Sequence, residues 1–197
     1  LVLCLYLFVP VKGTLPILPV CACIITLCLS YLLTMETVRR ADLTVTVLDV
    51  GQGQSVALTA GNVTALVDCG GTKSPGDTAA TFLQSVGKGT LDLLVLTHFH
   101  EDHAGGVPEL MGRIRVRDLL LPQLDEESDL RREIEAAAKK QGTRIHYISE
   151  TTQVDLGKAD LTVYAPLSAG GGANEGCLAM VCTVGDWDAL ITVDMPT

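Results

Sequence analysis

Hydrophobic and polar positions follow two different patterns in the middle of this 197-residue chain. Residues 43–49 alternate apolar and polar side chains, which is typical of a strand with one buried face. Residues 91–96 are almost continuously apolar, which is typical of a strand buried on both faces. Residues 55–59 and 63–67 flank a Gly-Asn turn and predict a β-hairpin. The patterns therefore predict four strands before residue 97.

Helical patterns are interspersed with these strands. Asp77 can cap a helix that runs to about residue 86, and residues 105–111 predict a short helix. Residues 126–140 carry acidic side chains early and lysines late, which matches the helix dipole, and Gly142 should end that helix. Further strands are expected at residues 113–121, 144–148, 154–156, 161–164, 177–184 and 189–193. Strands mixed with amphipathic helices indicate a layered α/β architecture.

The amino-terminal part of the chain has a different composition. Residues 1–34 contain one charge, Lys12, and residues 15–34 form an uncharged run of 20 residues. As a helix, such a run is just long enough to cross a bilayer core of about 30 Å. The alternatives are a buried core helix or a signal peptide, although the basic start and small-residue cleavage site of a signal peptide are absent. We predict a transmembrane helix at about residues 15–34, within the end of a membrane-embedded region.

The rest of the chain is divided accordingly. Residues 35–42 are interpreted as a linker and residues 43–197 as one globular domain. The chain starts at Leu1 and stops just after an apolar strand, so we expect a fragment of a longer protein with an incomplete domain. Arg39 and Arg40 weakly favour a cytoplasmic domain, but so few basic residues carry little weight.

Charge and cysteine content limit the classes of ligand and metal site that we expect. The chain has 14 basic and 23 acidic residues, a net charge of −9, which argues against a generic polyanion binder. Arg113, Arg115 and Arg117 alternate on one expected strand and could meet a phosphate backbone, although a solvated strand face is the favoured alternative. None of the seven cysteines forms a Cys-x-x-Cys pair, so no thiolate metal site is expected.

The candidate chemistry follows directly after the apolar run at residues 91–96. Three of the four histidines lie in the segment Thr97-His98-Phe99-His100-Glu101-Asp102-His103. His98 and His100 are two apart at a strand end, so their side chains should point the same way. Asp102 and His103 follow after the chain has turned, and this mixture of nitrogen and oxygen ligands suits borderline divalent metals. We predict a metal site here rather than a chance cluster of surface histidines.

Two aspartates are candidates for groups that support the metal ligands. Asp49 and Asp68 each follow an apolar strand and precede a glycine closely, so their carboxylates could hydrogen-bond the metal-binding histidines. The alternative is that both are turn aspartates that cap the following loop. His146 lies in the middle of an expected strand and is interpreted as a strand histidine outside the site.

The His-x-His-x-Asp-His pattern resembles the signature of the metallo-β-lactamase superfamily. The resemblance implies an αββα sandwich with two divalent metal ions, zinc or manganese, at one end. It implies that His98 and His100 bind the first metal and that Asp102 and His103 bind the second. It also implies that a later aspartate at a strand end, Asp194, bridges the two metals.

The chain departs from the superfamily pattern after the histidine cluster. Asn174 stands where the superfamily often has a third histidine, and an amide oxygen is a weak metal ligand. A final histidine, which normally follows the bridging aspartate, would lie beyond Thr197. The expected site is therefore incomplete within this chain.

A wider resemblance is to the hydrolase domain of the ComEC family, bacterial DNA-internalisation competence proteins. It covers residues 43–194, and the apolar residues 1–34 are similar to the end of that family's multi-helix channel region. The matching segments are Val47-Leu-Asp-Val-Gly-Gln-Gly53, Leu66-Val-Asp-Cys-Gly-Gly71, Leu91-Asp-Leu-Leu-Val-Leu-Thr-His98 and Asn174-Glu-Gly-Cys-Leu178. The resemblance implies a nuclease that degrades the DNA strand not taken up. Its expected partners are DNA, the membrane and its own upstream channel region, and we expect a multi-pass protein of the bacterial cell membrane with the hydrolase domain on the outer face.

Two adjacent divalent ions can lower the pKa of a bridging water and offset charge on a phosphoryl or acyl oxygen. Asp102 would orient that nucleophile, so Asp102 and His103 are the predicted catalytic residues. Two alternatives remain open: a hydrolase of a small ester, thioester or lactam, and a catalytically degenerate transport module. The missing third histidine favours the degenerate module and the intact first cluster opposes it, and fold alone does not decide between them.

Overall fold

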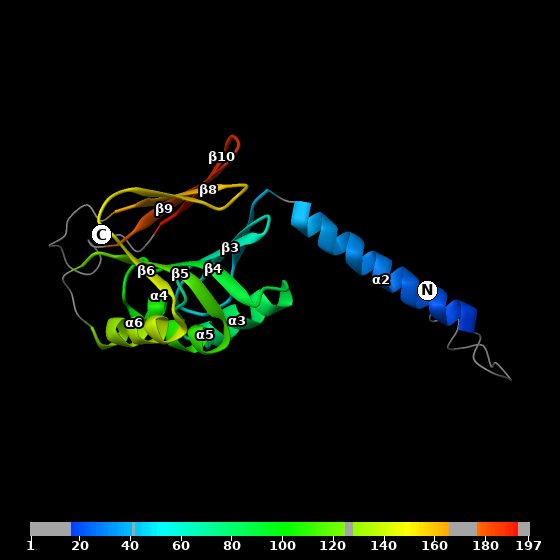
Figure 1. The fold of residues 1–197 in the computed structure, drawn as a ribbon, viewed down its shortest axis with the longest axis horizontal. Helices are drawn as coiled ribbons and strands as arrows, with labels where there is room; N and C mark the ends of the chain where they lie inside the picture. Colours follow the sequence, from blue (N-terminus) through cyan, green and yellow to red (C-terminus); the bar gives the residue numbers. More distant parts are fainter. Residues whose placement is uncertain (1–16, 41, 125–127, 166–176, 193–197) are drawn as a thin grey trace. The chain divides into compact units, whose positions relative to one another are not determined.

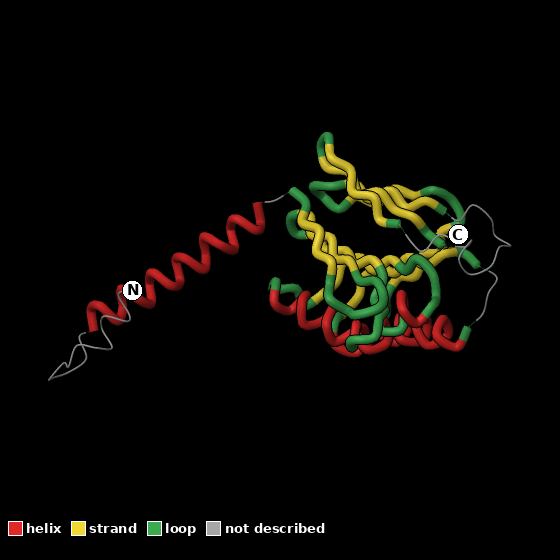
Figure 2. Tube along the Cα trace, turned by 180° about the vertical axis from the view of Figure 1, so that it is seen from behind, coloured by secondary structure: helices red, strands yellow, loops and turns green. Residues whose placement is uncertain are grey.

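The computed structural model describes residues 17–40, 42–124, 128–165 and 177–192. The chain divides into two compact units, Leu1–Ala41 and Asp42–Thr197, which are described separately. The second unit holds two β-sheets and a layer of helices (Figures 1 and 2).

The larger sheet contains six strands in the order β1-β2-β3-β4-β5-β6. Its first three strands pair antiparallel, and β3 to β6 pair parallel, so the sheet is mixed. The strands are β1 (Thr44–Val47), β2 (Val56–Ala60), β3 (Val63–Val67), β4 (Thr90–Val95), β5 (Arg115–Pro122) and β6 (Arg144–Ile148). The predicted hairpin is the β2–β3 pair, and the parallel arrangement brings the carboxyl ends of β3, β4 and β5 to one edge of the sheet.

The smaller sheet is antiparallel throughout, with the strand order β10-β9-β8-β7. Its strands are β7 (Thr152–Asp155), β8 (Asp160–Tyr164), β9 (Ala179–Val184) and β10 (Trp187–Ile191). It packs over one face of the larger sheet, and the helices cover the other face (Figures 1 and 2). These layers match three of the four layers of the expected αββα sandwich, and a second helical layer is not among the described residues.

The helices of this unit are α3 (Pro75–Ser85), α4 (Glu101–Ala104), α5 (Val107–Arg113) and α6 (Asp129–Gln141). Local sequence signals explain the ends of α6. The Ser128 hydroxyl accepts a hydrogen bond from the Arg131 backbone N–H at 3.1 Å, and Gly142 ends the helix with a left-handed φ of 75°. The helix predicted at residues 126–140 therefore exists but begins later.

Two hydrophobic cores hold the layers together. Leu94 and Leu119 pack between the larger sheet and the helices, whereas Leu93 and Val95 pack between the two sheets. Adjacent residues of β4 thus point into different cores, which confirms the strand buried on both faces that was predicted for residues 91–96. This burial anchors the segment that leads into the histidine cluster.

The first unit contains α2 (Ile17–Arg40), so a helix does form where an apolar helix was expected. Among the residues described, no helix combines the length and the hydropathy that crossing a bilayer requires. The prediction of a transmembrane helix at residues 15–34 is therefore not confirmed.

The predicted strand with alternating arginines is wrong in part. Arg113 is the last residue of α5, because Ile114 N–H still donates to Leu110 O, and its guanidinium forms an ion pair with Asp77. Arg117 does lie on β5, but it forms an ion pair with Asp92 at 2.6 Å. The three arginines therefore do not form one free basic face along a strand.

Candidate metal centre

The histidine cluster begins at His98, three residues after the end of β4, and continues into α4. His98 and His103 are buried, with 2% and 4% of their surface exposed, whereas His100 is exposed at the N-cap of α4. The ring centroid of His98 lies 4.6 Å from that of His100 and 4.1 Å from that of His103. Because β4 carries the chain directly to this point, the three imidazoles meet at the carboxyl edge of the parallel strands.

The ligand atoms of this cluster lie close enough to serve a cation. One ligand atom from each of His98, His100 and Asp102 lies within 4.8 Å of the others. Histidine nitrogen and carboxylate oxygen are ligands that zinc binds, at bond lengths of about 2.0–2.2 Å. The donor set therefore fits a borderline divalent ion and contains the first pair of predicted ligands.

The second predicted pair also comes together. His103 Nε2 lies 4.0 Å from Asp102 Oδ2, and the Asp102 side chain is 44% exposed. Asp102 thus lies close to His98 and His100 and also close to His103. This arrangement allows one carboxylate to border two adjacent cation positions.

Asp68 is the buried centre of the hydrogen bonds behind the cluster. Its Oδ1 accepts from the Thr97 backbone N–H at 2.8 Å, and its Oδ2 accepts from the Thr97 hydroxyl at 2.7 Å. His103 Nδ1 lies 2.8 Å from the same Oδ2. Burial raises the pKa of Asp68, and the hydrogen bonds from His103 and Thr97 oppose that shift. The predicted hydrogen bond between Asp68 and a histidine of the cluster is therefore present, and metal binding by that histidine stays a prediction.

The Thr97 hydroxyl links Asp68 to His98. It lies 3.0 Å from His98 Nδ1, and a hydroxyl has only one hydrogen. When Asp68 is ionised it accepts that hydrogen, so Thr97 must accept a hydrogen bond from His98 Nδ1–H. His103 likewise donates from Nδ1, so the nitrogen that would bind a metal is Nε2 in both histidines. The role of Thr97 does not follow from the sequence pattern alone, and the signal for it is a hydroxyl residue directly before a candidate ligand.

Two glycine-containing loops hold the backbone of the cluster in place. Cys69 N–H donates to His103 O at 2.7 Å, and Gln54 N–H donates to Asp102 O at 2.9 Å. A Cβ at Gly70 would overlap the backbone of Asp102 and His103. The segments around Gly53 and Gly70, both of which resemble the ComEC family, therefore lie against the histidine segment. Glycine is needed at these two positions because a side chain would overlap the neighbouring backbone.

Comparison of the sequence with models of protein families identifies the family of this chain. Residues 48–177 match the model described as the metallo-beta-lactamase superfamily, which is more than half of the chain. The chain belongs to this superfamily. Its fold is therefore that of metal-dependent hydrolases. The resemblance of the His-x-His-x-Asp-His pattern to the metallo-β-lactamase superfamily is confirmed. Among curated proteins, none matches the chain.

Solved structures agree with the superfamily fold. MEM-A1, a subclass B3 metallo-β-lactamase from a soil metagenome library, is 16% identical, with a TM-score of 0.54 over 76% of this chain and 60% of that one. MIM-1, from Novosphingobium pentaromativorans, is 16% identical with a TM-score of 0.50, covering 73% of this chain and 59% of that one. A chemotaxis sensor, ODP, described with a peroxy diiron species, is 14% identical with a TM-score of 0.50, covering 71% of this chain and 55% of that one. The chain thus corresponds to less than two thirds of each, and the likeness shows the fold alone.

Asp49 does not occupy the supporting position proposed for it. Its side chain is 80% exposed and forms an ion pair with Lys73 at 2.9 Å. The hydrogen bonds from Lys73 and the Gly51 backbone N–H lower the pKa of Asp49. The prediction that Asp49 supports a metal ligand is therefore wrong. Asn174 and Asp194 lie outside the described residues, so their predicted roles stay predictions.

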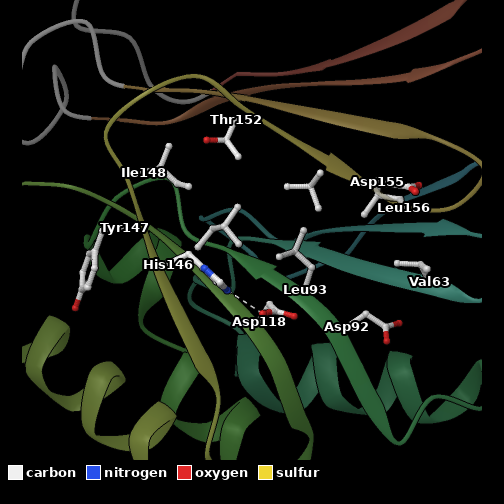
Figure 3. Close-up of a pocket in the computed structure, with 12 residues that line it drawn as sticks. Val63, Asp92, Leu93, Asp118, His146, Tyr147, Ile148, Thr152, Asp155 and Leu156 are labelled. Atoms are coloured by element: carbon white, nitrogen blue, oxygen red, sulfur yellow. Dashed lines mark hydrogen bonds and ion pairs between the residues drawn. The ribbon is translucent and has the colours of Figure 1, made fainter.

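His146 lies away from the metal-ligand group. It projects from β6 into a pocket of about 500 Å³ between the two sheets, where its Nε2 lies 2.9 Å from Asp118 Oδ1 (Figure 3). The apolar part of that pocket includes Leu93, Leu120 and Ile148. This position agrees with the interpretation of His146 as a strand histidine.

Proposed function

We propose that this superfamily member is a metal-dependent phosphodiesterase that cleaves DNA during uptake. The observation that supports hydrolysis most strongly is the cluster of His98, His100, Asp102 and His103, with Asp68 hydrogen-bonded behind it. The choice of DNA rests on the resemblance of residues 43–194 to the ComEC hydrolase domain. Under this proposal the strand that is not imported is the substrate.

The residues of this chain would divide the work as follows. His98 and His100 would hold the first of two divalent ions, zinc or manganese, and Asp102 and His103 the second, with Asp194 between them. The bound ions would supply a hydroxide at neutral pH and offset the charge that develops on phosphate. Asp102 would orient the nucleophile, and Asp68 and Thr97 would keep the imidazoles turned toward the metals.

The acidic composition sets the expected mode of DNA binding. With a net charge of −9, the chain should hold DNA weakly by itself. Arg113 and Arg117 are already engaged by Asp77 and Asp92, which leaves less basic surface for phosphate. We therefore propose that an upstream channel region delivers the strand, in a multi-pass protein of the bacterial cell membrane whose hydrolase domain lies on the outer face. This part rests on the resemblance of residues 1–34.

The test is metal-dependent cleavage of labelled single- and double-stranded DNA by the full-length protein. Asp102→Ala should reduce cleavage on the order of 10²-fold or more, because a lost metal ligand removes both nucleophile generation and charge stabilisation. DNA binding should be nearly unchanged, since Asp102 would hold a metal and not the polymer. Asp186→Ala, which removes an exposed carboxylate from the turn between β9 and β10, is the matched control and should cleave normally.

A second candidate is hydrolysis of a small ester, thioester or lactam. It is favoured by the fold shared with MEM-A1, a subclass B3 metallo-β-lactamase. A lactone, a thioester and a β-lactam should therefore be assayed beside DNA. Turnover of one of these with no DNA cleavage in any metal would overturn the nuclease proposal. Bound metal with no turnover of any substrate would instead support a degenerate transport module.

A further inference from the structure

Arg131 links four parts of the fold beside the metal-binding segment. It lies in the first turn of α6, and its side chain is only 16% exposed. Its Nε donates to Glu135 Oε1 at 3.0 Å, and its Nη1 donates to the backbone oxygen of Leu124 at 2.8 Å. Leu124 follows β5, whose carboxyl end shares a sheet edge with the metal cluster. One guanidinium thus ties α6 to the loop that leaves β5.

The same guanidinium lies over two aromatic rings. Its Cζ is 5.3 Å from the ring centroid of Phe99 and 5.6 Å from that of Tyr147. Both distances are within the range of about 6 Å at which a cation is attracted to an aromatic face. The Tyr147 hydroxyl also donates to Glu135 Oε1 at 3.0 Å. Arg131, Glu135 and Tyr147 therefore each contact the other two.

Phe99 connects this group to the metal site. It stands between His98 and His100 in the sequence, and its ring packs against the core between the larger sheet and the helices. Its backbone is bonded directly to that of both histidines, so fixing the Phe99 ring also restricts the backbone from which the two imidazoles project. The position of the ring therefore affects the spacing of two candidate ligands.

We propose that Arg131 is a positioning residue for the metal centre, which it stabilises through Phe99 without touching the metal. The contact is available because α6 begins at Asp129, with Ser128 as its N-cap, which places Arg131 in the first turn, where its side chain reaches both Leu124 and Phe99. The proposal rests on metal binding by the cluster, which is part of the proposed function, but it does not depend on the substrate.

Metal affinity of the full-length protein is the test, measured by titration with Zn²⁺ and with Co²⁺. Arg131→Met keeps an unbranched side chain and a similar helix propensity but removes the charge and the fork of donors. Its affinity should fall about 10-fold or more, as is common for residues that orient ligands. The matched control is Arg132→Met on the same helix turn, an arginine that is 63% exposed, and it should bind within about twofold of the unchanged protein.

Two further variants separate positioning from general stability. Arg131→Lys restores a cation and should recover part of the affinity. Phe99→Leu should weaken binding as Arg131→Met does, and combining the two should cost little more than either alone, because both break one contact. The Co²⁺ absorption spectrum at saturation should change in Arg131→Met and Phe99→Leu but not in Arg132→Met, since it reports ligand geometry.

The proposal is overturned if Arg131→Met keeps its affinity within about twofold and its Co²⁺ spectrum, or if Arg132→Met loses as much. If Arg131→Met does not fold, unchanged affinity in Phe99→Leu overturns it, and weakened affinity with an altered spectrum supports it. Absence of DNA cleavage in all variants, with these affinity differences intact, would reject the nuclease and leave the role of Arg131 standing.

Discussion

His103 Nδ1 lies 2.8 Å from Asp68 Oδ2, and the aspartate is fully buried. The residues are 35 positions apart, and they meet because β3 and β4 are parallel neighbours whose carboxyl ends lie together. The same Oδ2 accepts from the Thr97 hydroxyl, which in turn contacts His98. One carboxylate therefore orients a candidate ligand from each of the two expected metal positions.

Asp68→Asn should weaken metal binding about 10- to 100-fold, because an amide cannot accept all the hydrogen bonds that the carboxylate receives. Both expected metal positions should be affected. Metal titration of the full-length protein checks this, with Asp49→Asn as the control for an exposed aspartate paired only with Lys73. Equal affinities in the two variants would show that the hydrogen bonds behind the ligands do not matter.

Replacing both His98 and His100 with alanine should abolish stoichiometric binding at the first metal position, because two of its ligands are lost. Metal analysis of the purified protein measures this directly.

His146→Gln should leave metal content, and any hydrolysis, within about threefold, since His146 contacts Asp118 in the pocket between the sheets. Two bound ions in the double variant, or one ion lost in His146→Gln, would show that the ligands are misassigned.

Gly70→Ala should lower the free energy of unfolding by about 2 kcal/mol or more, because the added methyl group overlaps the backbone at His103. Metal affinity should fall with it. Gly112→Ala is the matched control: its Cβ would meet nothing within 4 Å, and alanine in α5 should raise stability by up to about 1 kcal/mol. Urea unfolding measures both variants, and a Gly70→Ala protein as stable as the unchanged chain would contradict the close approach.

Asp118 should contribute to the pH dependence of stability. Burial raises its pKa, but hydrogen bonds from Arg144 and His146 outweigh burial and leave the pKa below the ordinary value of 3.8. The folded protein therefore binds fewer protons at this site than the unfolded chain near pH 4. The stabilisation is fully present above the ordinary pKa and is lost as the pH falls through the lowered one.

The corresponding experiment compares Asp118→Asn with the unchanged protein. The variant should be less stable at pH 7 by under about 1 kcal/mol, because Arg144 is well exposed and such pairs are screened. The difference between the two proteins should shrink as the pH is lowered below 4. Asp186→Asn, at an exposed turn, should leave the stability at pH 7 unchanged. A difference between Asp118→Asn and the unchanged protein that grows in acid would refute the assigned direction.

Much of the local structure could be predicted from the sequence because it depends on near neighbours. The apolar run of β4, the β2–β3 hairpin and the Gly142 end of α6 follow from side-chain period and turn chemistry. The histidine cluster could be recognised for the same reason, since its ligands are supplied by six consecutive positions. The family that this cluster indicated is the one that the chain belongs to.

Only the tertiary structure decided which carboxylate hydrogen-bonds the candidate ligands. Asp49 and Asp68 share the same local pattern, an apolar strand followed by glycine. Asp49 follows β1, an edge strand, and reaches solvent and Lys73. Asp68 follows β3, which lies between β2 and β4, so its carboxylate is enclosed and faces the cluster. The contact between Arg131 and Phe99 joins segments far apart in the chain, and no local pattern determines such a meeting, because it depends on how the helical layer packs on the sheet.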